Sequence, residues 1–127
     1  GMDAAKDDEM PSGYRVYING GRVKTDLDAL AWAKKAVDLG AGEIVLNSMD
    51  ADGTKNGYEI NLTRMIAENV SVPVIASGGG GNSQHLADVL KEGKADAALI
   101  ATMVHSGQYT VNSIKQDLQK QGVPVRL

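Results

Sequence analysis

The chain has 127 residues, 43% of them hydrophobic, and its 13 basic and 16 acidic side chains give a net charge of -3. That length suffices for one domain with a buried core. The balanced charge provides no basic surface for nucleic acid or an anionic membrane, and the absence of cysteine excludes disulfides, thiolate metal sites and cysteine nucleophiles. No apolar run approaches the roughly 18 residues that cross a bilayer, and the first residues lack a signal-peptide core. We therefore expect a soluble, cytoplasmic protein that acts on small molecules.

The first part of the chain predicts a hairpin followed by a helix. Tyr14–Ile18 alternates between apolar and polar residues and ends in the turn sequence Asn19–Gly21, which predicts a short arm that continues to about Val23. Thr25 is expected to cap a helix of about 14 residues that ends at Gly40.

After this helix a short apolar strand, a polar or glycine-rich loop and a helix follow one another three times. The expected strands are Glu43–Asn47, Pro73–Ala76 and Asp96–Ile100, and the expected helices are Leu62–Asn69, one capped by Ser83 and ended by Gly93, and Val111–Gln121. This alternation predicts right-handed βαβ crossovers and a parallel sheet buried on both faces.

The loop after the second of these strands is the first candidate binding site. Ser77, Gly78 and Gly79 stand where a strand leads to a helix, so their backbone N–H groups can surround a phosphate. A tight turn is the alternative interpretation, but four consecutive glycines favour the anion site. Ala101 and Thr102, which end the next strand, are a second donor group, because barrel phosphate sites use the last two loops. Neither the P-loop nor the dinucleotide motif is present, so we expect no nucleotide.

The loop after the first of these strands carries two carboxylates. Asp50 and Asp52 follow the strand end, where such folds hold their chemistry, and either can handle protons. Asp-x-Asp-Gly also begins a calcium loop, with Glu59 at the required spacing, but a strand rather than a helix precedes it. A solvated turn is the ordinary interpretation of Asp50. His85 and His105 stand alone and are assigned packing or surface roles, and we expect no metal and no cofactor.

Several short motifs coincide along the chain: Met2–Ala4, Gly20–Arg22, Trp32–Ala33, Leu39–Glu43, Asn47–Thr54, Ile75–Gly79 and Val125–Leu127. Together they resemble the second half of the cyclase subunit of imidazole glycerol phosphate synthase. The resemblance spans essentially the whole chain. It implies an α/β fold, half of a TIM (βα)8-barrel with parallel strands and outer helices. Residues 1–127 would form one C-terminal half-barrel from the tip of the fifth strand to the eighth helix.

The resemblance also implies a function in histidine biosynthesis. The family joins ammonia, delivered by a glutaminase partner, to a phosphoribulosyl aminoimidazole carboxamide ribonucleotide. Ring closure and lyase cleavage then give imidazole glycerol phosphate and an aminoimidazole carboxamide ribotide. A sugar-phosphate isomerase of the same pathway shares the barrel and the phosphate loops, but the Asn-Ser-x-Asp-x-Asp-Gly-Thr run favours the cyclase.

Roles follow residue by residue from the same resemblance. Asp3 and Asp52 are the implied catalytic residues, and Glu43 and Arg126 match charged residues near the barrel floor. The implied substrate and phosphate ligands are Asn47, Gly53, Thr54, Ser77, Gly78, Gly79, Ala101 and Thr102.

A (βα)8-barrel needs about 250 residues, so we expect this chain alone to lack full activity. Its open strand edges are expected to pair with the N-terminal half-barrel or with another copy. A stand-alone phosphate-binding module is the alternative function.

Overall fold

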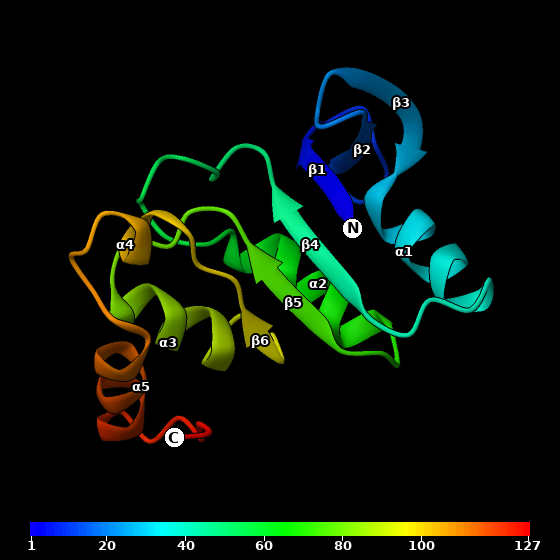
Figure 1. Cartoon of the computed structure of the whole chain (residues 1–127). Helices are drawn as coiled ribbons and strands as arrows, with labels where there is room; N and C mark the ends of the chain where they lie inside the picture. Colours follow the sequence, from blue (N-terminus) through cyan, green and yellow to red (C-terminus); the bar gives the residue numbers. More distant parts are fainter.

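A computed structural model describes all 127 residues and contains one six-stranded sheet in the order β3-β2-β1-β4-β5-β6 (Figure 1). Strands β1, β4, β5 and β6 are parallel, whereas β2 and β3 form an antiparallel arm on β1. The strands are β1 (Met2–Lys6), β2 (Tyr14–Ile18), β3 (Val23–Asp28), β4 (Ile44–Ser48), β5 (Val74–Ser77) and β6 (Ala97–Ala98). The helices are α1 (Ala29–Asp38), α2 (Ile60–Asn69), α3 (Ser83–Lys91), α4 (Thr102–His105) and α5 (Val111–Lys120).

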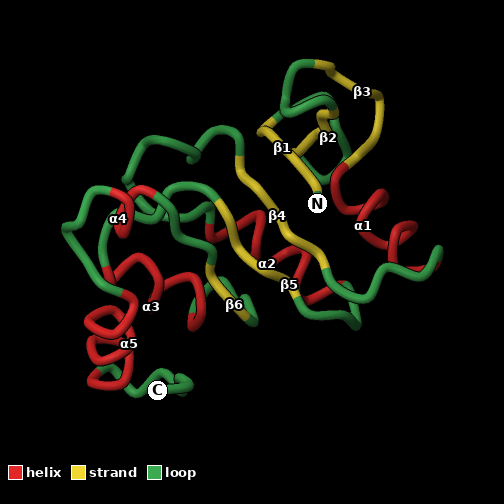
Figure 2. Tube along the Cα trace, in the orientation of Figure 1, coloured by secondary structure: helices red, strands yellow, loops and turns green.

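Each parallel strand is followed by a helix: β1 by α1 after the arm of β2 and β3, β4 by α2, β5 by α3, and β6 by α4 and α5 (Figure 2). This is the arrangement of half a (βα)8-barrel, and both the predicted fold class and the predicted hairpin arm are confirmed. None of the five helices could span a lipid bilayer.

The two faces of the parallel sheet differ in what covers them. Alternate residues of a strand point to opposite faces, and one face packs against α1, α2, α3 and α5 in two apolar clusters. The strand residues on this covered face are Met2, Ala4, Ile44, Leu46, Val74 and Ala76. The other face, which carries Asp3, Val45, Asn47, Ile75 and Ser77, is only half-buried. The prediction of a sheet buried on both faces is therefore wrong, because the helices form a single layer.

Helix α1 begins later than the sequence predicts. Thr25 lies in β3, where its hydroxyl donates to Val16 O at 2.6 Å and so joins the two strands of the arm. The cap is Asp28, whose carboxylate accepts from the backbone N–H of Ala31 at 3.0 Å. The second strand of the arm takes up residues that the helical pattern had assigned to α1, so the helix has 10 residues.

Helix α3 differs by one residue in the same way. Asn82, not Ser83, caps it and accepts from the backbone N–H of His85 at 2.9 Å. The Ser83 hydroxyl instead donates to Asp117 of α5 at 2.7 Å. Ser83, the predicted cap, therefore links α3 to α5, and the neighbouring Asn82, which has the same capping chemistry, caps α3.

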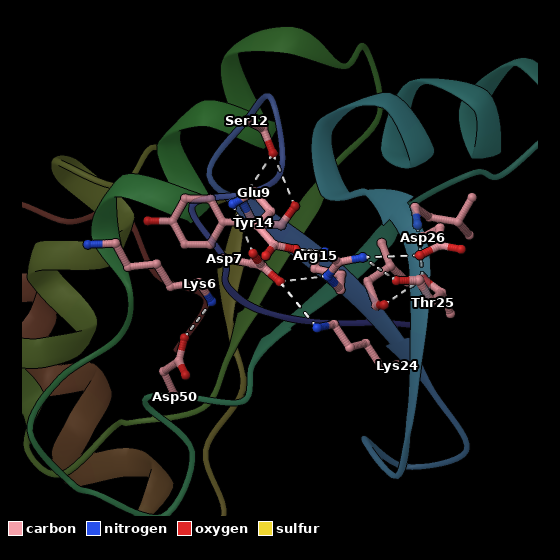
Figure 3. A network of polar contacts seen from close by, with 12 residues as sticks. Lys6, Asp7, Glu9, Ser12, Tyr14, Arg15, Lys24, Thr25, Asp26 and Asp50 are labelled. Atoms are coloured by element: carbon pink, nitrogen blue, oxygen red, sulfur yellow. Dashed lines mark hydrogen bonds and ion pairs between the residues drawn. The ribbon is translucent and has the colours of Figure 1, made fainter.

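A buried arginine holds the arm against β1 (Figure 3). The Arg15 side chain is 4% exposed and pairs with Asp7 at 2.6 Å and with Glu9 and Asp26 at 3.4 Å each. It also donates to Thr25 O at 2.8 Å. A buried guanidinium is costly without such partners. Because the arm pairs with β1 from Asp3 to Lys6, this edge of the parallel sheet is covered rather than open.

We expect Asp7→Asn to lower the free energy of unfolding at neutral pH, because Arg15 loses its closest partner. The hydrogen bond from Arg15 holds the pKa of Asp7 below its ordinary value of 3.8. The ionised carboxylate therefore stabilises the fold above that value, and this contribution is lost as the pH falls through the lowered pKa. Denaturant unfolding at a series of pH values should show the difference between wild type and variant shrinking below pH 3.8.

Lys24→Gln is the matched control, because Lys24 is exposed and lies 3.9 Å from the same Asp7 carboxylate. It should change stability little. An Asp7→Asn penalty that stays constant down to the acid limb would contradict the role given to this ion pair.

Candidate functional site

Three side chains stand in a row across adjacent strands on the half-exposed face. Asp3 of β1 is in register with Asn47 of β4, which is in register with Ser77 of β5. The Asn47 amide donates to Asp3 Oδ1 at 3.0 Å, and the Ser77 hydroxyl donates to Asn47 Oδ1 at 3.1 Å. Asn47 is thus oriented by both neighbours, and the strand register brings together residues far apart in the sequence.

A small polar hollow of about 60 Å³ lies beside Ser77, where the loops after β4, β5 and β6 meet. Ser77 belongs to both the row and the hollow. The predicted site residues that line the hollow are Asp52, Gly53, Ser77, Gly78, Gly79, Ala101 and Thr102.

The glycines after β5 have unused hydrogen-bond donors. The backbone N–H groups of Gly78, Gly79 and Gly80 make no hydrogen bond within the chain, whereas Gly81 N–H donates to His85 Nδ1 at 3.0 Å. All three free donors belong to residues that line the hollow. Backbone N–H groups that converge on one concave surface bind anions, so the hollow has the donors of an anion site.

Glycine is also required here by close packing between loops. Gly79 has φ of +106°, and a side chain on it would overlap Gly57 O. Gly57 N–H in turn donates to Gly79 O at 2.8 Å. A side chain on Gly78 would come within 2.8 Å of Ser48 O. The glycine run therefore lets the loop after β4 lie directly on the loop after β5, so close packing requires glycine here whether or not an anion binds.

Two other polar residues of the loop after β4 do not line the hollow. The Thr54 hydroxyl donates to Ala51 O at 2.7 Å and accepts from Asn56 N–H, so it stabilises its own turn. Asp50 accepts from Lys6 N–H at 2.7 Å and joins this loop to β1 (Figure 3). Thr54 is thus the one predicted phosphate ligand that is neither in the row nor in the hollow.

Glu59 does not complete a calcium site. Its carboxylate caps α2 by accepting from Leu62 N–H at 2.5 Å, and it accepts from the Tyr14 hydroxyl at 3.1 Å. No group of three or more His, Asp or Glu side chains is placed to hold a metal ion. The calcium interpretation therefore lacks its bidentate ligand.

The remaining charged candidates lie away from the hollow. Glu43 directly precedes β4, at the opposite end of the strand, and Arg126 lines a groove beside the start of β6. His85 supports the glycine run through Gly81 and so has a packing role.

Sequence reasoning missed Lys55, which lines the hollow. Its only signal is that it is the first cation after the Asp-Gly-Thr run.

Tyr58 packs between the glycine run and the loop after β6. Its side chain is buried, and its hydroxyl donates to Leu99 O at 2.7 Å in the loop after β6. A side chain on Gly80 would come within 2.6 Å of the same hydroxyl. Burial raises the pKa of Tyr58 to about 12. Tyr58 therefore connects the glycine run to the third loop of the site.

We expect Tyr58→Phe to cost about 1 kcal/mol of stability at pH 7, because Leu99 O loses its partner. Because the pKa of Tyr58 is raised in the folded chain, the free energy of unfolding of the wild type should decrease as the pH rises from about 10 to about 12. This decrease should be smaller in the variant. Tyr14, whose pKa is also about 12, supplies the rest. Chemical denaturation at each pH measures both effects.

Tyr17→Phe is the control for this experiment, because the Tyr17 hydroxyl has no hydrogen bond in the structure. An alkaline stability profile that is identical in wild type and Tyr58→Phe would contradict the role of the buried hydroxyl.

Fold and site together define a class. A parallel βα sheet with a carboxylate, an amide and a hydroxyl at its carboxyl-terminal rim, beside a hollow with free N–H donors, is the architecture of a (βα)8-barrel protein. In such proteins this rim is where active sites are found.

Comparison with known proteins identifies the family. Residues 1–110 match the model of the family described as "Histidine biosynthesis protein", and the chain belongs to this family. It is 63% identical over 129 residues to the protein named "Imidazole glycerol phosphate synthase subunit HisF" of Desulfatibacillum aliphaticivorans, covering 99% of the chain and 50% of that relative. The protein of the same name in Methanococcus maripaludis is 58% identical over 113 residues, covering 89% and 42%. The resemblance drawn from the motifs is confirmed.

The chain spans about half the length of these curated relatives. A solved structure, the Amycolatopsis orientalis BexX/CysO complex, is similar over 77% of this chain and 43% of its own, with a TM-score of 0.61 and 20% identity. That similarity concerns the fold alone.

Proposed function

We propose that the chain supplies the C-terminal half of a cyclase that forms imidazole glycerol phosphate. In this proposal residues 1–127 are one unit, and β1, β4, β5 and β6 are barrel strands five to eight. Its substrates are ammonia and a phosphoribulosyl aminoimidazole carboxamide ribonucleotide. The observation that carries the proposal is the hydrogen-bonded row of Asp3, Asn47 and Ser77 beside the anion-type hollow, in a chain 63% identical to a protein of that name.

Each residue has a chemical task in this proposal. Asp3 Oδ1 accepts from Asn47, which leaves Oδ2 free to exchange a proton with the substrate, the work of a general acid or base. Asn47 holds that carboxylate in place. The N–H groups of Gly78 and Gly79 bind one phosphoryl group of the substrate, and Asp52, which lines the same hollow, contacts the substrate.

Turnover with ammonia tests this function. The chain alone should be inactive, and activity should appear when the N-terminal half of the Desulfatibacillum aliphaticivorans relative is added. Asp3→Asn should lower kcat by about 100- to 10,000-fold, the usual contribution of one general acid or base. Asp8→Asn, a change of the same charge on the exposed loop before the arm, should leave kcat unchanged.

Equal turnover by the Asp3→Asn and wild-type proteins would contradict the assignment. Phosphate binding without any restored turnover, when both halves are folded, would favour the stand-alone phosphate-binding module instead.

We further propose that this chain associates through its uncovered surfaces. Strand β6 ends the sheet with only two residues, and beside it lies a mostly hydrophobic groove of about 530 Å³ between α3, α5 and the C-terminal segment. Val45 and Ile75 on the half-exposed face add apolar surface. Such edges and patches favour association. The occupant is the N-terminal half-barrel, or a second copy in its absence, and a glutaminase subunit then delivers ammonia near Glu43.

Sedimentation velocity tests the association. The chain alone should sediment as an oligomer, and adding the N-terminal half should convert it to a one-to-one complex. Val125→Glu, which places a charge in the groove, should weaken both assemblies by at least tenfold in Kd. Lys120→Glu, at the exposed end of α5, is the control. A wild-type chain that stays monomeric and ignores the N-terminal half would contradict this proposal.

A further inference from the structure

The hollow contains a negative charge that its backbone N–H donors do not neutralise. Asp52 lines it, and a carboxylate repels a phosphomonoester, which carries about two negative charges near neutral pH. The free N–H groups of Gly78, Gly79 and Gly80 are dipoles without net charge. Lys55 is the one cationic residue among those that line the hollow.

The backbone of Lys55 is held in an unusual conformation. Its φ is +59°, in the left-handed region, which costs a residue with a side chain about 1–2 kcal/mol. Such a conformation persists where the surroundings impose it. A side chain on Gly81 would come within 2.5 Å of Lys55 O, so the lysine backbone lies directly on the glycine run.

The lysine side chain has no competing partner. No carboxylate lies within 4.0 Å of its ammonium, because none of the ion pairs of the structure includes Lys55. Lys94 has the same left-handed conformation, with φ of +56°, but pairs with Glu68 at 2.9 Å and lies away from the hollow. Lys55 therefore combines an imposed backbone position at the hollow with a free positive charge.

We propose that Lys55 determines the specificity of the hollow for a phosphomonoester dianion. Its ammonium binds the phosphoryl oxygens that the glycine N–H groups do not reach, and it offsets the charge of Asp52. This assignment rests on the proposed phosphate site. It adds the one side chain that lets the site distinguish a dianionic phosphate from a neutral or singly charged group.

Isothermal titration of the chain with inorganic phosphate and with glycerol phosphate tests this role. Lys55→Gln should weaken both by about 10- to 100-fold, the usual worth of a hydrogen bond to a charged group, whereas Lys55→Arg should retain most of the affinity. Lys94→Gln makes the same charge change at the other left-handed lysine and should leave the affinity unchanged.

A second variant separates binding from folding. Lys55→Gly relieves the left-handed strain, so its midpoint of denaturant unfolding should not fall, while its phosphate affinity should fall as in Lys55→Gln. Wild-type binding that is unaffected by either change would overturn the role of Lys55 alone. Absence of phosphate binding by the wild-type chain, both alone and with the N-terminal half, would overturn the phosphate site as well.

Discussion

The register of the parallel strands is the constraint on which the rest of the structure depends. One register places Asp3, Asn47 and Ser77 side by side on the half-exposed face and Ala4, Leu46 and Ala76 on the face that the helices cover. A slip by one residue would exchange the two sets. It would bury a carboxylate, an amide and a hydroxyl against the helices and expose apolar residues of both core clusters. The energy that stabilises the core therefore also aligns the rim.

The loops above that rim depend on a second constraint, the absence of side chains. The glycine run after β5 accepts the loop after β4 at a distance that a Cβ would not permit. The same residues leave three backbone N–H groups without partners. Close packing and free donors thus come from one short sequence, and Tyr58 extends the contact to the loop after β6. The Arg15 network performs a different task, because it fixes the arm that covers the outer edge of β1.

Much of this arrangement was predictable from the sequence. Alternation of short apolar strands with helices gave the βα order, the Asn19–Gly21 turn gave the arm, and loops that follow parallel strands necessarily meet at one rim. Helix starts were less predictable. Thr25 and Ser83 have the right chemistry for a cap, but each makes a tertiary hydrogen bond, and Asp28 and Asn82 serve instead.

Other features required three-dimensional information. The βα alternation by itself does not say that the helices form one layer, so it missed the half-exposed face; the half-barrel with outer helices that the resemblance implies does place them on one side. Lys55 was missed because its importance comes from a left-handed backbone and from its contact with the glycine run, neither of which produces a periodic pattern. Thr54 has a side chain that suits phosphate, yet its hydroxyl is engaged within its own turn.

The free N–H donors above β5 are the feature through which fold and function meet. Their ligand preference can be observed directly in an amide NMR titration of the chain with inorganic phosphate. Saturable shifts concentrated on the amides of Gly78, Gly79 and Gly80, with little change in the arm around Arg15, are the result that this account requires. Shifts spread over exposed lysines without saturation, or none at the three glycines, would contradict it.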